Sequence, residues 1–394
     1  MKVLMINTEK DRGGAARMAS TLVGAFNQQD SEVQAVLAHC GDNEVNESFK
    51  GFKKSYAFYL NILQTRLFGS HHIYDFSFAD KIIELSKEAD VIHIHNLHGY
   101  YLDYVKLIKA ISNKPIVWTW HDMWGATGRC GFAMDCEGWK SGCNTCEYLN
   151  YYPKVWVDNA ASEYRIKSEL FSNNEKLYIV SPSDWLRDIA IERGFNAERA
   201  VTIPNPVDLS RYKPIDKVSA RKHFNLPDEP LLLFVAHDCS DERKRYKDFE
   251  KVAVMSGIKG VVVGVPPENL HPELIYLGKL SSSDELANAY SAADAFVITS
   301  QSDNYPNTVI ESMACGTPVF GYAIGGIPSQ MPLLWNGLVD YLDIESLAEH
   351  LKIYIATSSE FQLEARETVR SHASYNWDPV TVAEKYIKLY SSIL

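Results

Sequence analysis

Two carboxylates, Asp303 and Glu311, stand eight residues apart in a stretch that carries loop and helix signals. Pro306 lies between them, and Gly316 and Pro318 follow, which predicts a loop, a helix that ends at Gly316, and then a Val-Phe strand. The amides at the start of such a helix attract a phosphate. Carboxylates accept hydrogen bonds from sugar and ribose hydroxyls. Together these groups are the parts of a nucleotide-sugar site.

Histidines gather in two neighbouring segments. His93, His95 and His98 fall in and after one apolar run, and His121 follows the next one. Alternation along a strand places His93 and His95 on one face. Imidazoles bind zinc, and they also donate and accept hydrogen bonds, so the pattern alone indicates either a metal site or a hydrogen-bonding site.

Four of the seven cysteines lie in one loop, at residues 127–147: Cys130, Cys136, Cys143 and Cys146. The Cys-x-x-Cys pair at its end can chelate one tetrahedral ion, and two further thiolates would complete a closed, structural zinc site. Free thiols packed in the loop and a disulfide remain the alternatives, although a reducing cytoplasm disfavours the disulfide.

Adjacent glycines and a run of cations mark two further loops. Gly13 and Gly14 follow the first apolar run, where a glycine pair lets the backbone approach a ligand. The second loop carries a run of cations, in which Lys244 lies between Arg243 and Arg245. On its own such a run is typical of a solvated surface.

Composition and charge narrow the classes of protein. The chain has 394 residues, 46% of them hydrophobic and 23% charged, which is typical of a globular protein with more than one core. A formal net charge of −11 argues against nucleic acid as the main partner. No apolar run reaches the roughly 20 residues that span a bilayer. The first strand runs into the glycine loop without a cleavage site, which predicts a cytoplasmic protein.

The elements that must position these residues alternate between strand and helix patterns. Continuous Val, Ile and Leu runs separated by helical segments predict an α/β protein with parallel sheets covered on both faces. We expect two doubly wound, Rossmann-like domains facing a central cleft, where such folds bind ligands. Residues 1–205 would form the first domain, 206–376 the second, and 377–394 a last helix.

The stretch around Asp303 resembles the donor loop of the retaining glycosyltransferases of family 4, also called group 1 glycosyltransferases, which have the GT-B fold. Their loop reads Glu, seven residues, Glu, with Gly-Phe-Pro after the first Glu and Ala-x-Gly-x-Pro-Val after the second. Here Asp303 stands for the first Glu, and Asn304-Tyr305 stands for Gly-Phe. The matching residues are Pro306, Asn307, Glu311, Ala314, Gly316, Pro318 and Val319.

The resemblance implies roles in the second domain. Lys244 would clamp the donor diphosphate with Arg243 beside it, Asp303 would position the sugar hydroxyls, and Glu311 would bind the nucleotide ribose. Further donor contacts are expected from the loop and the helix start: Asn304, Tyr305, Pro306, Asn307 and Thr308. The family has an additional Arg where this chain has Asp238, so the missing charge would come from another residue: Arg243, Arg245 or Lys247.

The resemblance also implies roles in the first domain and favours hydrogen bonding over a catalytic metal. His121 ends a Thr-x-His motif and would contact the donor sugar, while Gly13 and Gly14 would lie beside the diphosphate. Acceptor contacts are expected from three further residues: His95, His98 and Asn205. The Cys-rich loop resembles an insertion in members that build bacterial polysaccharides. The last helix would cross back to the first domain, as it does in the family.

The implied reaction moves a sugar from a UDP- or GDP-linked donor to a saccharide or lipid-linked acceptor, with retention, in bacterial surface polysaccharide synthesis such as that of capsule, exopolysaccharide or O-antigen. Two alternatives remain. A nucleotide-sugar 2-epimerase of the same fold would need acid and base groups at C2 of the sugar and no acceptor. A non-catalytic, thiol-metal module would be built on a degenerate transferase scaffold.

The segment Lys53–Phe68 has apolar and aromatic residues at helical spacing between basic flanks. This pattern indicates either peripheral contact with the inner face of a membrane or an ordinary helix that faces the core.

Overall fold

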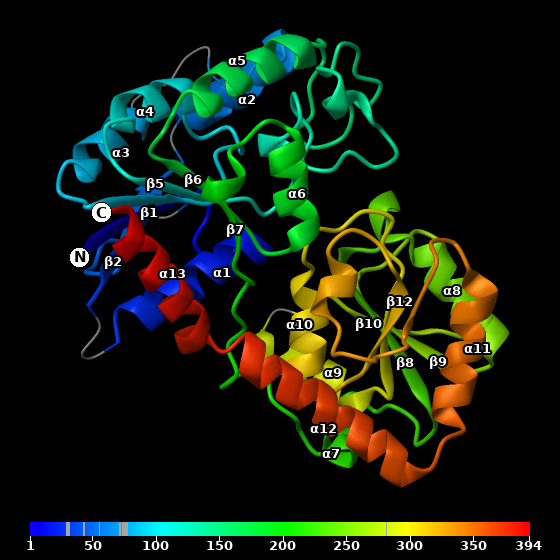
Figure 1. Ribbon diagram of the computed structural model, residues 1–394. Coiled ribbons are helices and arrows are strands. Elements are labelled where there is room, and N and C mark those ends of the chain that lie inside the picture. The colour runs from blue at the N-terminus through cyan, green and yellow to red at the C-terminus, as the bar shows by residue number, and fades with distance from the viewer. Residues whose placement is uncertain (29–31, 42–43, 55, 71, 73–77, 281) are drawn as a thin grey trace. The chain divides into compact units, whose positions relative to one another are not determined.

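The computed structural model of the chain (Figure 1) describes all residues except 29–31, 42–43, 55, 71, 73–77 and 281. The chain forms two compact units. Unit 1 comprises Met1–Pro206 together with Pro379–Leu394, and unit 2 comprises Val207–Asp378. Ser55, in the segment considered for membrane contact, lies outside the described residues.

Unit 1 is built on a seven-stranded sheet in the order β3-β2-β1-β4-β5-β6-β7, and every pairing between these strands is parallel. Its strands are β1 (Lys2–Asn7), β2 (Gln34–Gly41), β3 (Phe49–Lys53), β4 (Val91–Ile94), β5 (Ile116–Thr119), β6 (Leu177–Ser181) and β7 (Ala200–Thr202). Its helices are α1 (Gly14–Phe26), α2 (Tyr56–Phe68), α3 (Phe78–Ser86), α4 (Tyr104–Ile111), α5 (Ala160–Ser172), α6 (Asp184–Glu192) and α13 (Pro379–Ile393).

Apolar cores lie on both faces of this sheet, because the strands are apolar on both sides. Ile6 and Ile94 belong to one core, while Met5 and Val117 belong to the other. The second core includes α13, whose Tyr386 ring meets Phe26 of α1 edge-on at 6.5 Å. The end of the chain is therefore part of the core of unit 1.

Unit 2 has a six-stranded parallel sheet in the order β10-β9-β8-β11-β12-β13. Its strands are β8 (Leu231–Asp238), β9 (Lys259–Val265), β10 (Ile275–Gly278), β11 (Ala295–Ile298), β12 (Val319–Tyr322) and β13 (Leu338–Val339). Its helices are α7 (Lys217–His223), α8 (Tyr246–Ser256), α9 (Ser283–Ala292), α10 (Asn307–Ala314), α11 (Ile344–Ile355) and α12 (Ser359–Asn376). Apolar cores again cover both faces.

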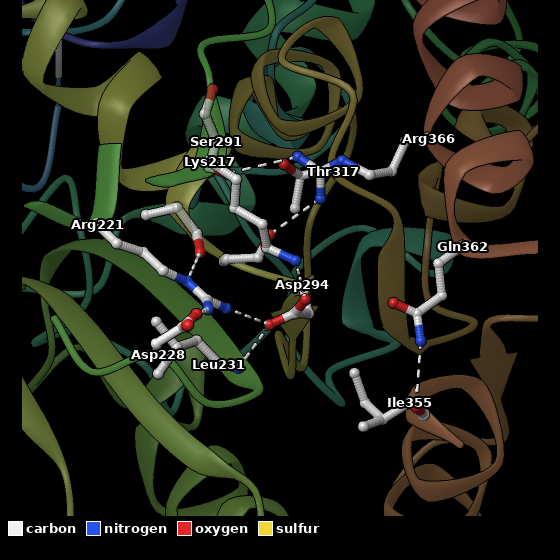
Figure 2. A network of polar contacts seen from close by, with 12 residues as sticks. Lys217, Arg221, Asp228, Leu231, Ser291, Asp294, Thr317, Ile355, Gln362 and Arg366 are labelled. Atoms are coloured by element: carbon white, nitrogen blue, oxygen red, sulfur yellow. Dashed lines mark hydrogen bonds and ion pairs between the residues drawn. The ribbon is translucent and has the colours of Figure 1, made fainter. Parts of the chain in front are cut away.

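A buried ionic network joins helices of unit 2 to its central strand (Figure 2). The Asp294 carboxylate accepts hydrogen bonds from the Arg221 guanidinium at 2.9 Å and the Leu231 amide at 2.8 Å, and Lys217 also pairs with it. Arg366 of α12 donates to the Ala293 carbonyl at 3.0 Å. Asp294 thus anchors α7 to the start of β8.

The two parallel-sheet domains predicted from the apolar runs are confirmed. Three strands were not predicted: β3, β7 and β13. The β3 sequence alternates Phe with Lys and Gly at the sheet edge, and β7 and β13 are only three and two residues long, so none carries a continuous apolar run. Among the described residues, no helix has the length and apolarity to cross a membrane.

Candidate active site

Four histidines of unit 1 lie in or just after β4 and β5, and three of them are buried: His93, His95 and His98. His95 lies just after β4 and His121 two residues after β5, and His95 Nδ1 is 2.9 Å from His121 Nε2. The two rings stack with centroids 5.2 Å apart, and His93 packs on His95 at 4.3 Å. Parallel strands that end at the same edge bring these side chains together. The predicted grouping of His95 with His121 is therefore observed within unit 1.

Burial keeps this cluster neutral. It lowers the pKa of His93 to about 3, with His121 adding to the effect. It lowers the pKa of His121 to about 4, although Asp122 partly opposes it. The pKa of His95 is also lowered by burial. At neutral pH these imidazoles act as hydrogen-bond donors and acceptors rather than as cations. Within the described structure, His95 Nε2 is buried and has no hydrogen-bond partner.

Two tyrosines of α13 contact the histidine cluster through His93 and Thr119, and the sequence did not predict this contact. Tyr390 Oη is 2.6 Å from His93 Nδ1, and His93 Nε2 is 2.8 Å from Thr119 Oγ1. Thr119 Oγ1 is in turn 3.0 Å from Tyr386 Oη. Tyr386 and Tyr390 are four residues apart and so share a helix face. Both ring nitrogens of His93 are thereby occupied, which fits a structural role for His93.

His98 belongs to a second polar group at the same edge. Its Nε2 lies 2.9 Å from Asp122 Oδ2, and its Nδ1 lies 3.3 Å from the hydroxyl of Tyr152. Burial would raise the pKa of Asp122, but the His98 imidazole and the Trp124 amide lower it. Asp122 and Tyr152 were not predicted, although the His-Asp dipeptide at 121–122 offered a signal. This ionised carboxylate is positioned to orient His98.

The glycine loop provides a helix start without a cap. Gly13 has φ 98°. The space beside it is open, because no atom lies within 4 Å of the position that a Cβ would take there. No side chain caps α1, and its first turn carries no acidic residue. The amides that follow Gly13 and Gly14 are therefore suited to an anion. Asn205 is buried at the end of the first segment of unit 1.

In unit 2, Lys244 and Asp303 form a direct ion pair. Lys244 Nζ is 2.6 Å from Asp303 Oδ2, and both side chains are mostly buried. The loops that carry them are tied together, because Thr299 Oγ1 donates to the Lys244 carbonyl at 3.1 Å and the Gln301 amide donates to the Arg243 carbonyl at 2.8 Å. The structure thus brings together two predicted site residues that are far apart in sequence.

A close backbone approach fixes the Asp303 loop from the other side. A Cβ at Gly325 would lie 2.1 Å from the Asp303 carbonyl oxygen, and Gly325 has φ +56°. The Gly326 amide donates to that same oxygen at 3.3 Å. Only glycine allows this contact at position 325. The carboxylate of Asp303 is therefore held by backbone packing as well as by Lys244.

The predicted helix after this loop is observed as α10, which begins directly after Pro306. Its first turn carries no acidic residue and no side-chain cap, and it contains Asn307 and Thr308. Glu311 is buried and accepts a hydrogen bond from the Tyr290 hydroxyl at 3.2 Å. Asn304 is buried beside Tyr305, whose hydroxyl accepts a hydrogen bond from Trp377 Nε1 at 2.7 Å.

The other cations of the loop have partners of their own. Arg243 pairs with Asp241, Arg245 pairs with Asp248, and the exposed Lys247 pairs with Glu250. Asp238, which stands where the family has an Arg, accepts hydrogen bonds from Ser240 that lower its pKa. Lys244 thus contacts a donor-loop carboxylate directly, and the choice among Arg243, Arg245 and Lys247 stays open.

The four clustered cysteines are free thiols in the structure. Cys143 Sγ accepts the Gly128 amide at 3.2 Å, Cys136 Sγ accepts the Gly138 amide at 3.3 Å, and Arg129 donates to Cys146 Sγ at 3.7 Å. Burial raises the pKa of the Cys130 thiol to about 11. Among the described residues, no group of three or more His, Cys, Asp or Glu is placed to hold a metal ion. The loop therefore does not form a four-thiolate site as it stands, and zinc stays a prediction.

Known proteins resemble both halves of the chain. The family model described as Glycosyltransferase Family 4 matches residues 12–211, and the model described as Glycosyl transferases group 1 matches residues 267–372. The glycosyl transferase WcaC of Escherichia coli (strain K12), named for colanic acid biosynthesis, is 26% identical over 410 residues that cover 100% of both chains. A D-inositol 3-phosphate glycosyltransferase of Streptomyces bingchenggensis (strain BCW-1) is 31% identical over 161 residues, 34% of this chain and 35% of its own.

Solved structures agree on the fold. Anabaena Alr3699/HepE in complex with UDP and glucose matches with a TM-score of 0.70 at 16% identity, over 100% of both chains. A sucrose-phosphate synthase from Thermosynechococcus elongatus matches with a TM-score of 0.68 at 18% identity, over 100% of this chain and 98% of its own. These matches and the two parallel sheets show the GT-B fold, and the family model that spans residues 12–211 shows the family. The chain is a glycosyltransferase that belongs to family 4.

Proposed function

We propose that the chain transfers a sugar from a nucleotide diphosphate sugar to a saccharide or lipid-linked saccharide, with retention of the anomeric configuration, in the synthesis of a bacterial surface polysaccharide. Similarity to WcaC over the full length supports the polysaccharide role. Alr3699/HepE is a structural neighbour described with UDP and with UDP-glucose, which supports a nucleotide-sugar donor and favours UDP over GDP.

The observation that carries the proposal is the Lys244–Asp303 pair beside the start of α10. A mostly buried ammonium group and a carboxylate 2.6 Å apart offer one group for phosphate and one for sugar hydroxyls. The uncapped N-terminus of α10 adds amides that attract a negative charge. Glu311, held by Tyr290, would bind the ribose. These groups all come from unit 2, which we assign to the donor.

Lys244 would act chemically by stabilising the leaving group. Negative charge builds on the diphosphate as its bond to the sugar breaks, and a fixed ammonium group lowers the barrier without having to reorganise. The amides after Gly13 would contribute in the same way. Asp303 pre-orients Lys244 in the absence of donor and would then share its hydrogen-bonding capacity with the sugar. This arrangement needs no carboxylate nucleophile, because the leaving phosphate can itself accept the proton of the acceptor hydroxyl in a front-face attack.

Unit 1 would provide the acceptor contacts and one imidazole for the donor sugar. Neutral His121, backed by His95, can donate or accept a hydrogen bond at a hydroxyl of the donor sugar without adding a charge. The buried Nε2 of His95 offers another such position. His98, oriented by Asp122, would bind a hydroxyl of the incoming saccharide.

A donor panel tests the proposal. Thermal stability is measured with UDP, GDP, UDP-sugars and GDP-sugars, and one nucleotide diphosphate with its sugars should raise the melting temperature of the wild type. Lys244→Ala should lose most of the increase. Lys251→Ala is the matched control, because Lys251 is exposed on neighbouring α8, and it should respond as the wild type does. No stabilisation by any nucleotide, or equal stabilisation of Lys244→Ala, would reject the donor site.

A further inference from the structure

Arg129 lies in the Cys-rich loop and is only 1% exposed. Its guanidinium donates to a run of backbone carbonyls that follows this loop: Tyr148 at 2.7 Å, Leu149 at 3.3 Å, Tyr151 at 2.9 Å and Pro153. A guanidinium presents five N–H donors in one rigid plane, and hydrogen bonds from a charged donor are stronger than neutral ones. The backbone of residues 148–153 is therefore held around one buried group.

Tyr152 lies in this segment and contacts the second polar group of the candidate site. Its hydroxyl is 3.3 Å from His98 Nδ1, and the two ring centroids are 5.6 Å apart at an angle of 72°. Tyr152 is nevertheless 53% exposed, beside His98 at 7%. A tyrosine combines an apolar ring with a polar tip. Here the tip lies against a candidate acceptor residue, while much of the residue stays open to solvent.

The turn after β5 holds this segment from the other side. The Met123 amide donates to the Gly131 carbonyl at 2.7 Å, and the Gly131 amide donates to the Tyr152 carbonyl at 3.5 Å. A Cβ at Gly131 would lie 3.2 Å from Asp122 Oδ2, the oxygen that contacts His98. Tyr152, His98 and Asp122 therefore form one group at the carboxyl edge of the unit 1 sheet, where such folds bind ligands.

Backbone strain accompanies the same group. Tyr100, two residues after His98, has φ 66°, a left-handed conformation that is unfavourable for a tyrosine. Its ring meets that of Tyr152 edge-on, with centroids 6.2 Å apart. Strained residues persist where the surrounding structure fixes them, and they gather at ligand sites. The exposed Tyr152, the buried Arg129 and the strained Tyr100 together indicate a binding surface.

We propose that Tyr152 is the surface on which the sugar ring of the acceptor packs, and that Arg129 is the residue that positions Tyr152. A sugar ring has a face of C–H groups with partial positive charge, and the face of an aromatic ring is negative. His98 and Asp122, grouped with Tyr152, would bind hydroxyls of the same sugar. The acceptor group recognised here is a saccharide ring rather than a lipid phosphate. That this sugar is the acceptor rests on the proposed function, whereas sugar binding at Tyr152 does not.

Ligand-observed NMR without donor tests sugar binding at Tyr152. Aromatic protons of the full-length protein are saturated in the presence of methyl pyranosides of glucose, galactose, mannose and N-acetylglucosamine. At least one glycoside should receive saturation, most strongly at the ring protons of one face. Tyr152→Ser should weaken the binding of that glycoside by about tenfold or more, as expected for the loss of one stacking contact. Tyr152→Phe keeps the ring and should bind within about threefold of the wild type.

A matched control and a folding check accompany these variants. Tyr375→Ser removes an exposed tyrosine of unit 2 and should bind the glycoside as the wild type does. Because Tyr152 is exposed, its variants should have the circular dichroism of the wild type. Saturation of no glycoside by the wild type, or normal glycoside binding by Tyr152→Ser, would overturn the assignment of Tyr152.

The positioning role of Arg129 is tested on the ring of Tyr152 itself. In protein with ring-labelled tyrosine, the Tyr152 signal is identified by its absence in Tyr152→Phe. Arg129→Lys keeps the charge but loses the planar fork, so it should shift this signal and weaken glycoside binding by about threefold or more, while most other tyrosine signals stay in place. Arg129→Gln, which keeps two N–H donors without a charge, is the second variant.

Two outcomes separate the remaining claims. An unchanged Tyr152 signal together with unchanged glycoside binding in the Arg129 variants would overturn the positioning role. Transfer from nucleotide sugars is measured separately on the same wild-type protein. Glycoside binding at Tyr152 without any transfer would refute the proposed function and leave sugar binding at Tyr152 in place.

Discussion

Acid should destabilise unit 1, because its central histidines are buried in their neutral form. The pKa is lowered to about 3 for His93 and to about 4 for His121, while an unfolded histidine titrates near 6.5. Below that value the unfolded chain binds protons that the folded chain does not, so stability falls as the pH falls. A pH of 5 is about 1.5 units below the pKa of an unfolded histidine. The free energy of unfolding therefore falls by about 2 kcal/mol for each histidine and by about 4 kcal/mol for the pair.

Such a loss is large beside the roughly 5–15 kcal/mol that stabilise a typical domain. Urea unfolding at pH 7.5 and pH 5.0, followed by tryptophan fluorescence, measures it. Unit 1 carries most of the tryptophans that report: Trp118, Trp120, Trp124, Trp139, Trp156 and Trp185. Below about pH 4 the contribution of the pair to the slope of stability against pH should fall to about half, because His121 then becomes protonated in the folded state while His93 does so only near pH 3.

His93→Gln isolates the effect, because glutamine keeps a hydrogen-bonding group but does not titrate. The difference in unfolding free energy between the two pH values should shrink by about 2 kcal/mol. Glu163 raises the pKa of His72 despite burial, so protonation of His72 stabilises the folded state as the pH falls. This contribution is the same in the wild type and in His93→Gln, and it cancels when the two proteins are compared. His223→Gln, at an exposed position of unit 2, is the matched control and should leave the difference unchanged. A wild type that is equally stable at both pH values, or a His93→Gln protein with an unchanged difference, would refute the reasoning.

Three further outcomes are expected. Lys244→Ala and Glu311→Gln should each reduce sugar transfer by about a hundredfold or more at unchanged circular dichroism; near-normal turnover of both would remove the donor assignment. Asp294→Ala should destabilise unit 2 by about 3–5 kcal/mol, because Arg221 and Lys217 lose their buried partner, and a change below about 1 kcal/mol in urea unfolding would contradict this. Elemental analysis of protein prepared without chelator should find about one zinc per chain, lost in Cys143→Ser/Cys146→Ser; metal-free protein would leave the loop as free thiols.

The sequence predicts what depends on local pattern. Uninterrupted Val, Ile and Leu runs lead to buried parallel strands, and Pro306 and Gly316 bound α10, because such signals act within a few residues. Contacts made across the fold were not predictable in this way. Tyr390 meets His93 across 297 residues, and nothing in either segment identifies the other.

The pairing of Lys244 with Asp303 lies between these cases. Each residue was assigned to donor binding from its own motif, and the contact between their side chains emerged only from the packing of the β8 and β11 loops. Without the family motif, the run of cations around Lys244 would have been interpreted as a solvated surface. The exchange of a family Arg for Asp238 is explained locally by its hydrogen bonds to Ser240, while nothing in the structure shows which cation replaces it.

Transfer of a labelled sugar tests the central claim most directly. Wild-type protein is incubated with nucleotide sugars carrying an isotopic label and with a lipid extract from bacteria that make surface polysaccharide, and label in the lipid phase is counted together with released nucleoside diphosphate. The account predicts equimolar release and incorporation with one donor, retention at the anomeric carbon by NMR, and loss of both in Lys244→Ala but not in Lys251→Ala. Absence of incorporation with every UDP- and GDP-sugar, or isomerisation of the donor sugar without any acceptor, would contradict it.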